Sequence, residues 1–136
     1  MCADQMTMTK EQVYAEIEEE LGQVPGFFKT LPDGPLQSEW ALFKHFELGE
    51  TKLDPMTREL IGTAVAAGMR CWYCANFHGA LARFHGATEE QVQEAIHLAK
   101  FAAGWSTYLN GTVYDQQTFM RELEEVGAFL TKKHKS

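Results

Sequence analysis

The sequence predicts an all-α protein built as a single domain. Apolar residues recur at helical spacing along most of the 136 residues, and no stretch alternates apolar and polar residues with a period of two. Several of the periodic stretches begin at a cap-type residue and end at glycine. A chain of this length is large enough to bury a core of its own. We therefore expect one helical domain over residues 1–136.

The first half of the chain predicts three helical segments. Thr9 caps a helix from Lys10 to Leu21, which Gly22 ends. Residues 25–32 lie between prolines and allow only a turn or two of helix, and Pro35 opens the next helix. This region is rich in aromatic side chains, which we interpret either as core or, in part, as the lining of an apolar pocket next to the cysteines: Phe27, Phe28, Trp40, Phe43 and Phe46.

The second half predicts longer helices. Asp54-Pro55 is a helix start, and this helix continues to about residue 68. The next runs from about residue 71 to 84 and ends at Gly86, and Thr88 to Gln91 form a capping box that opens a helix to about residue 103. We expect Gly104 to interrupt it, residues 105–132 to be helical with a break near 110–111, and residues 132–136 to form a disordered tail.

Composition excludes several classes of function. The formal net charge is -7 and there is no extended basic run, which argues against nucleic-acid partners and anionic membranes. The longest charge-free apolar stretch, residues 60–69, is too short to span a bilayer, and residues 1–10 lack a signal-peptide pattern. We therefore expect a cytoplasmic protein. Its three cysteines form no disulfide framework, and we expect Cys2 to lie without function in a frayed terminus.

The reactive residues gather in one stretch. Cys71, Cys74 and His78 fall within an arc of roughly 60° at 100° per residue, and His78 lies one helical turn beyond Cys74. Glu59 lies on the preceding predicted helix with no Lys or Arg three or four residues further along. We interpret Glu59 either as a proton-exchanging carboxyl in a partly dry space or as a glutamate that only favours the helix N-terminus.

A helix N-terminus favours the thiolate form of cysteine, and two cysteines at this spacing can close a disulfide. The spacing to His78 assigns the attack to Cys74 and the resolving role to Cys71, with His78 and Glu59 carrying the proton. Two alternatives stay open. Zinc would need a fourth ligand, and His85 lies too far along the helix to supply it. The cysteines could also be plain core residues.

The chain carries a glutamate, Glu59, followed after eleven residues by the motif C-x-x-C-x-x-x-H over residues 71–78. This pattern resembles that of the AhpD-like proteins of the carboxymuconolactone decarboxylase superfamily. The flanks are similar as well: Leu53-Asp54-Pro55 before the glutamate and His85-Gly86-Ala87-Thr88 after the cysteine helix. The resemblance covers roughly residues 25–111, which we take as the core of the domain. It implies an AhpD-like helical bundle, with the C-x-x-C at the N-terminus of a central helix, that assembles into trimers or hexamers.

The resemblance also implies a thiol-dependent hydroperoxidase. The cysteine matching Cys74 meets the hydroperoxide, the one matching Cys71 resolves, and Glu59 and His78 relay protons. No bound cofactor is implied, and an external dithiol or thioredoxin-type protein would act as reductant. The chain departs from alkylhydroperoxidase D at Tyr73, where that protein has a further histidine. The alternatives are a thiol–disulfide oxidoreductase or redox sensor, and an acid–base enzyme like the decarboxylases of the superfamily.

Overall fold

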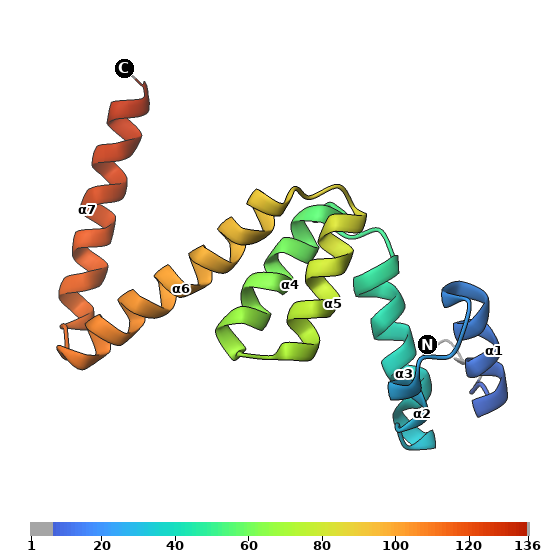
Figure 1. Cartoon of the computed structure of the whole chain (residues 1–136). Coiled ribbons are helices and arrows are strands. Elements are labelled where there is room, and N and C mark those ends of the chain that lie inside the picture. The colour runs from blue at the N-terminus through green and yellow to red at the C-terminus, as the bar shows by residue number, and fades with distance from the viewer. Residues whose placement is uncertain (1–6, 136) are drawn as a thin grey trace, which may run out of the picture. The chain divides into compact units, whose positions relative to one another are not determined.

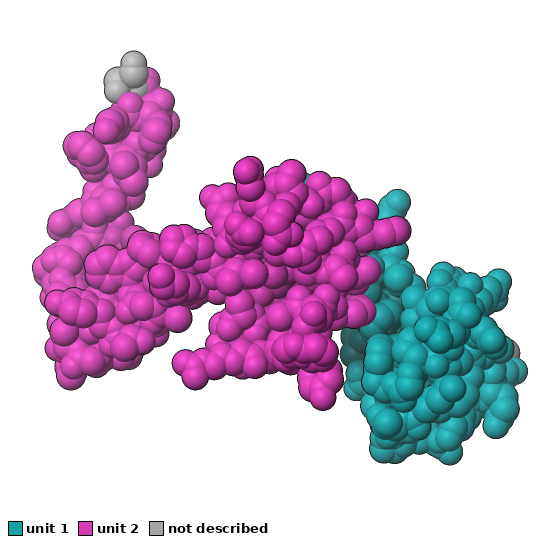
Figure 2. Space-filling view, viewed as in Figure 1, with its two compact units in different colours: residues 1–57 teal, residues 58–136 magenta. Residues whose placement is uncertain are grey.

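The structure is a computed structural model that describes residues 7–135, so Cys2 lies outside the described residues. Over this range the chain forms seven α-helices and one π-helical segment, with no β-strand (Figure 1). The prediction of an all-α protein is therefore confirmed. The chain divides into two compact units, residues 1–57 and 58–136 (Figure 2).

The first unit contains α1 (Lys10–Leu21), α2 (Gly26–Lys29), α3 (Asp33–Phe43) and the π-helical segment η1 (Lys44–Leu48). Thr9 caps α1 as predicted: its hydroxyl accepts the Gln12 N–H at 3.3 Å, and the Gln12 side chain accepts the Thr9 N–H at 2.8 Å. Gly22 ends α1 with φ 77°, a conformation that favours glycine. Helix α3 begins two residues before the predicted Pro35, because proline is tolerated within a first helical turn.

The core of the first unit contains some of the aromatic side chains of this region. Its buried members come from α1, α2 and α3: Val13, Ile17, Phe28, Leu36 and Trp40. Phe27 and Phe46 are instead more than half exposed, and with Phe43 they line a cavity of about 470 Å³ in this unit. The interpretation as core is thus confirmed for Phe28 and Trp40, and some of the other aromatic residues line an apolar cavity. That this cavity serves the cysteines stays a prediction.

The second unit holds most of α4 (Pro55–Met69) and all of α5 (Trp72–Phe84), α6 (Glu89–Gly111) and α7 (Gln116–Lys135). Asp54 caps α4 by accepting the Thr57 N–H at 3.0 Å. Thr88 and Gln91 form the predicted capping box of α6. Gly86 follows α5 with φ 95° and allows the chain to turn toward α6. In the described part of the chain, no helix is long and apolar enough to cross a membrane.

Two expectations about the C-terminal half are wrong. Helix α6 passes through Gly104 without a break, because one helical glycine costs only about 1 kcal/mol relative to alanine and the helix is 23 residues long. The expected disordered tail over residues 132–136 is helical as far as Lys135, the last described residue. The basic side chains there sit at the negative end of the helix dipole, where cations stabilise a helix.

Candidate functional site

A left-handed turn between α4 and α5 sets the position of Cys71. Arg70 has φ 56°, and its N–H donates to the Ala67 carbonyl at 3.1 Å. The Cys71 N–H donates to the Ala66 carbonyl at 3.0 Å. Together these bonds form a Schellman closure of α4, with arginine at the position that usually holds glycine. The closure fixes the backbone of Cys71 where the next helix begins.

Cys71 is the N-cap of α5. Its backbone is extended (φ -91°, ψ 105°), so it precedes the helix and does not share the helical stripe of Cys74 and His78. Our prediction of three groups on one stripe is therefore wrong for Cys71. Its sulfur instead turns back over the first turn, where it accepts the Cys74 backbone N–H at 3.3 Å and lies 2.8 Å from the Cys74 sulfur. Both cysteines are half-buried free thiols.

The hydrogen bonds make the two thiols unequal. The sulfur–sulfur hydrogen bond with Cys74, followed by the bond that the Cys74 backbone N–H donates to the Cys71 sulfur, holds the pKa of Cys71 below its ordinary value. The same sulfur–sulfur hydrogen bond, followed by desolvation, raises the pKa of the Cys74 thiol. The Cys74 backbone N–H and the N-terminus of α5 both favour a negative charge on the Cys71 sulfur.

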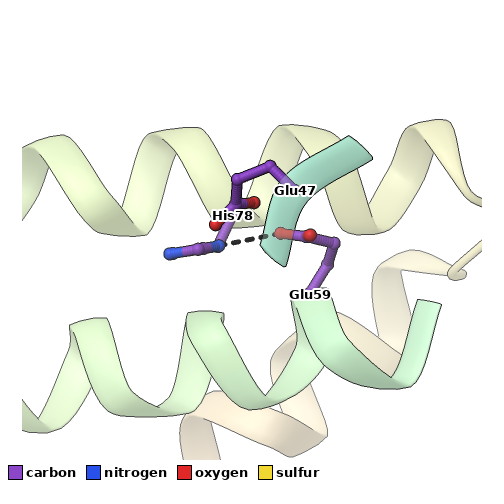
Figure 3. A group of neighbouring side chains, drawn as sticks. All are labelled: Glu47, Glu59 and His78. Atoms are coloured by element: carbon purple, nitrogen blue, oxygen red, sulfur yellow. Dashed lines mark hydrogen bonds and ion pairs between the residues drawn. The ribbon is translucent and has the colours of Figure 1, made fainter. Parts of the chain in front are cut away.

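Glu59 and His78 form a second pair, between α4 and α5 (Figure 3). The Glu59 side chain is fully buried, and its Oε2 lies 2.7 Å from His78 Nδ1. The Arg58 Nε lies 3.8 Å from the other carboxylate oxygen. A buried carboxylate needs such partners. The burial of Glu59 agrees with the interpretation that its carboxyl lies in a dry space. Its contact with His78 means that Glu59 does more than favour the N-terminus of α4.

The close approach of α4 and α5 at this pair depends on Gly62. A Cβ atom on Gly62 would lie 2.5 Å from Nδ1 and 2.6 Å from Cγ of the His78 ring. The ring therefore packs directly against the backbone of α4. This role is not among the predictions from the sequence, although Gly62 lies three residues after Glu59, on the same face of the helix.

The four predicted site residues thus lie in one unit as two pairs, Cys71 with Cys74 and Glu59 with His78. The link between the pairs is α5 itself, since His78 lies one turn after Cys74. In residues 7–135, neither sulfur belongs to a cluster of three metal-ligating side chains, so the zinc alternative gains no support. Tyr73, at the position of the missing histidine, is 79% exposed.

An all-helical fold with a C-x-x-C at the start of one helix and a buried carboxylate–imidazole pair on the same helices is AhpD-like. The chain belongs to the carboxymuconolactone decarboxylase family, whose sequence profile matches residues 35–113. This match crosses the boundary between the two compact units, so both contribute to one family domain.

Two individual proteins are similar to the chain. The crystal structure of the alkylhydroperoxidase AhpD core from Rhodospirillum rubrum has a TM-score of 0.67 and 30% sequence identity, covering 81% of this chain and 85% of that one. An uncharacterized protein in the cox locus of Paracoccus denitrificans is 47% identical over 47 residues, which is 35% of this chain and 42% of that protein. The chain thus matches less than half the length of this curated relative.

Proposed function

We propose that the protein is a thiol-dependent peroxidase that reduces organic hydroperoxides or hydrogen peroxide through Cys71 and Cys74. The observation that carries this proposal is the pair of half-buried sulfurs 2.8 Å apart at the start of α5. Thiols this close can form a disulfide with little movement of the backbone. The similarity to an alkylhydroperoxidase core adds support. Glu59 and His78 act as the proton relay.

The proposed reaction balances with one hydroperoxide per pair of thiols. One thiolate attacks the distal oxygen, the O–O bond breaks, and the alkoxide leaves as an alcohol after it takes a proton. The resulting sulfenic acid is attacked by the second sulfur, which forms the Cys71–Cys74 disulfide and releases water. An external dithiol or thioredoxin-type protein then reduces the disulfide by thiol exchange. No bound cofactor takes part in this scheme, and a cytoplasmic location, which stays a prediction, would supply such reductants.

The direct test is the intact mass of the reduced protein after one equivalent of cumene hydroperoxide. We expect rapid loss of two hydrogens in the wild type, mapped to a bridge between Cys71 and Cys74. Cys71→Ser and Cys74→Ser are the matched controls, and neither should form this bridge. Thiols that stay reduced in the wild type would contradict the peroxidase.

A second candidate, thiol–disulfide oxidoreductase or redox sensor, is favoured by one observation. Cys71 is an N-cap with a lowered pKa, as expected of a thiol that attacks disulfides. Thiols inert to peroxide that close quickly with a disulfide reagent would select this candidate. If neither reagent oxidises the cysteines, the Glu59–His78 pair becomes the basis for an acid–base enzyme like the decarboxylases of the family.

We also propose that the protein is a homo-oligomer, of the trimeric or hexameric kind that the family resemblance implies. The described residues of α7 include none that is buried. An apolar stripe at spacings of four, three and four residues follows its length: Phe119, Leu123, Val126 and Leu130. A second stripe at spacings of three, four and three residues follows α6: Leu98, Phe101, Trp105 and Tyr108. Such seams are typical of helices that pack against other helices.

Leu123→Glu should disrupt this assembly, because it places a carboxylate in the middle of the α7 stripe. We expect a lower mass by size-exclusion chromatography with light scattering than the wild type shows. Ala128→Glu introduces the same side chain on the opposite side of α7 and should leave the mass unchanged. A wild type that is monomeric at micromolar concentration would overturn the proposal.

A further inference from the structure

The two cysteine sulfurs form a pair of soft ligand atoms at the start of α5. They lie 2.8 Å apart as free thiols, and both residues are only half-buried, so an ion in solution can reach them. Cys71 precedes the helix and Cys74 lies in its first turn. Cysteine thiolates are the side chains that soft metal ions prefer as ligands. The pair therefore has the chemistry of a metal site as well as that of a redox centre.

We propose that Cys71 and Cys74 bind one Cu(I) ion as thiolates in the reduced protein. This site is separate in its chemistry from the proposed peroxidase and does not depend on it. Two copper–sulfur bonds form, two S–H bonds break, and the two protons pass to solvent. Copper enters and stays as Cu(I), so nothing is oxidised or reduced. The resulting complex of one cation with two thiolates carries one negative charge.

The number of available ligands selects the metal. Structural zinc sites take four ligands, and the common iron–sulfur clusters take four cysteines. Between residues 7 and 135, no group of three histidine, cysteine or acidic side chains includes either sulfur. Cu(I) is a soft ion that is stable with only two sulfur ligands, so a pair of thiolates can satisfy it. The same observation that leaves zinc without support therefore favours Cu(I).

The start of α5 stabilises the negative charge of such a complex. The Cys74 backbone N–H donates to the Cys71 sulfur at 3.3 Å, and the N-terminus of α5 is the positive end of its helix dipole. The exposed Arg70, immediately before Cys71, adds a positive charge nearby. Two metal–thiolate bonds of about 2.3 Å hold their sulfurs at most roughly 4.6 Å apart. A turn of the Cys74 side chain about its Cα–Cβ bond can supply this opening.

The test is a competition for Cu(I) between the reduced full chain and the coloured chelator bicinchoninate, in the absence of oxygen. The chain carries Cys2→Ser, which removes the third thiol. Loss of the chelator's absorbance measures the Cu(I) that the protein takes, and we expect one ion per chain. Cys71→Ser and Cys74→Ser should each bind at least about 100-fold more weakly, because loss of a supporting partner alone costs about 10–100-fold. Cu(I) that stays on the chelator would overturn the inference.

Met69→Leu is the matched control, because it removes a sulfur close to the pair in sequence and leaves both thiols. Met69 lies two residues before Cys71 and is 66% exposed. Its thioether carries no charge and is a weaker ligand than a thiolate. We therefore expect its affinity for Cu(I) to stay within about tenfold of that of the two-cysteine protein. A loss as large as that in the cysteine variants would refute a site made of two thiolates.

Alkylation with iodoacetamide identifies the ligands and the metal. Cleavage after Arg70 and Arg83 releases residues 71–83, which hold both cysteines. One equivalent of Cu(I) should block the label on both, whereas one equivalent of Zn(II) should leave labelling close to that of the metal-free protein. Equal protection by zinc would refute the choice of Cu(I).

Both measurements use no peroxide, so their outcome is independent of the proposed peroxidase. A protein that binds Cu(I) through the two cysteines but is inert to cumene hydroperoxide would overturn only the peroxidase. A protein that reduces the hydroperoxide but leaves Cu(I) on the chelator would overturn only the copper site.

Discussion

Gly62→Ala should destabilise the second unit and separate the Glu59–His78 pair. The added Cβ would lie 2.5 Å from His78 Nδ1, closer than real Cβ contacts come, so the ring or α4 must move. Overpacking of this kind costs roughly 1–3 kcal/mol. The His78 side chain is 23% exposed and can swing outward, which would break its 2.7 Å hydrogen bond and leave the buried carboxylate with a partner missing. Both a lower free energy of unfolding and slower disulfide formation are expected.

Gly68→Ala is the matched control for this prediction. Gly68 lies on the same helix, and a Cβ there would meet nothing within 4 Å. Alanine is the better helix former by about 1 kcal/mol, so this variant should be slightly more stable than the wild type. Urea unfolding of both variants, with the rate of Cys71–Cys74 bridge formation, checks the prediction. If Gly62→Ala behaves like Gly68→Ala, His78 does not pack against α4 as the structure shows.

Local signals predicted most helix boundaries because their causes are local. The Thr9 and Thr88 capping boxes, the Asp54 cap and the glycine after α5 each depend on residues within one turn. The sequence could not predict the turn at Arg70 or the similar one at Val113, because both have positive φ at residues other than glycine. The sequence also does not predict the full extent of α6, because a single glycine is a weak helix breaker inside a helix of 23 residues.

The site was predictable as a set of residue types but not as an arrangement. The spacing in the sequence predicts the four site residues, and the structure brings them into one unit: Glu59, Cys71, Cys74 and His78. Helical periodicity placed Cys71 on the helix, whereas the Schellman closure after α4 makes it an N-cap. That one-residue difference allows the Cys71 sulfur to accept the Cys74 backbone N–H. A period of 3.6 residues carries no information about where the first turn begins.

Glu59→Gln should slow the formation of the Cys71–Cys74 disulfide. Glutamine has nearly the same shape and can still accept a hydrogen bond from His78 Nδ1, but it carries no charge to stabilise the imidazolium that forms when Cys74 loses its proton. Loss of such a base costs about 10²–10⁴-fold. We therefore expect cumene hydroperoxide to close the Cys71–Cys74 bridge at least about 100-fold more slowly than in the wild type, which the intact mass followed over time measures.

Thr63→Val is the stability control for this experiment, since it removes a buried hydroxyl that donates to the Glu59 backbone carbonyl at 2.8 Å and leaves the carboxylate untouched. It should lower the free energy of unfolding by about 1 kcal/mol and leave the rate of disulfide formation near that of the wild type. An unchanged rate of disulfide formation in Glu59→Gln would contradict a proton relay through the Glu59–His78 pair.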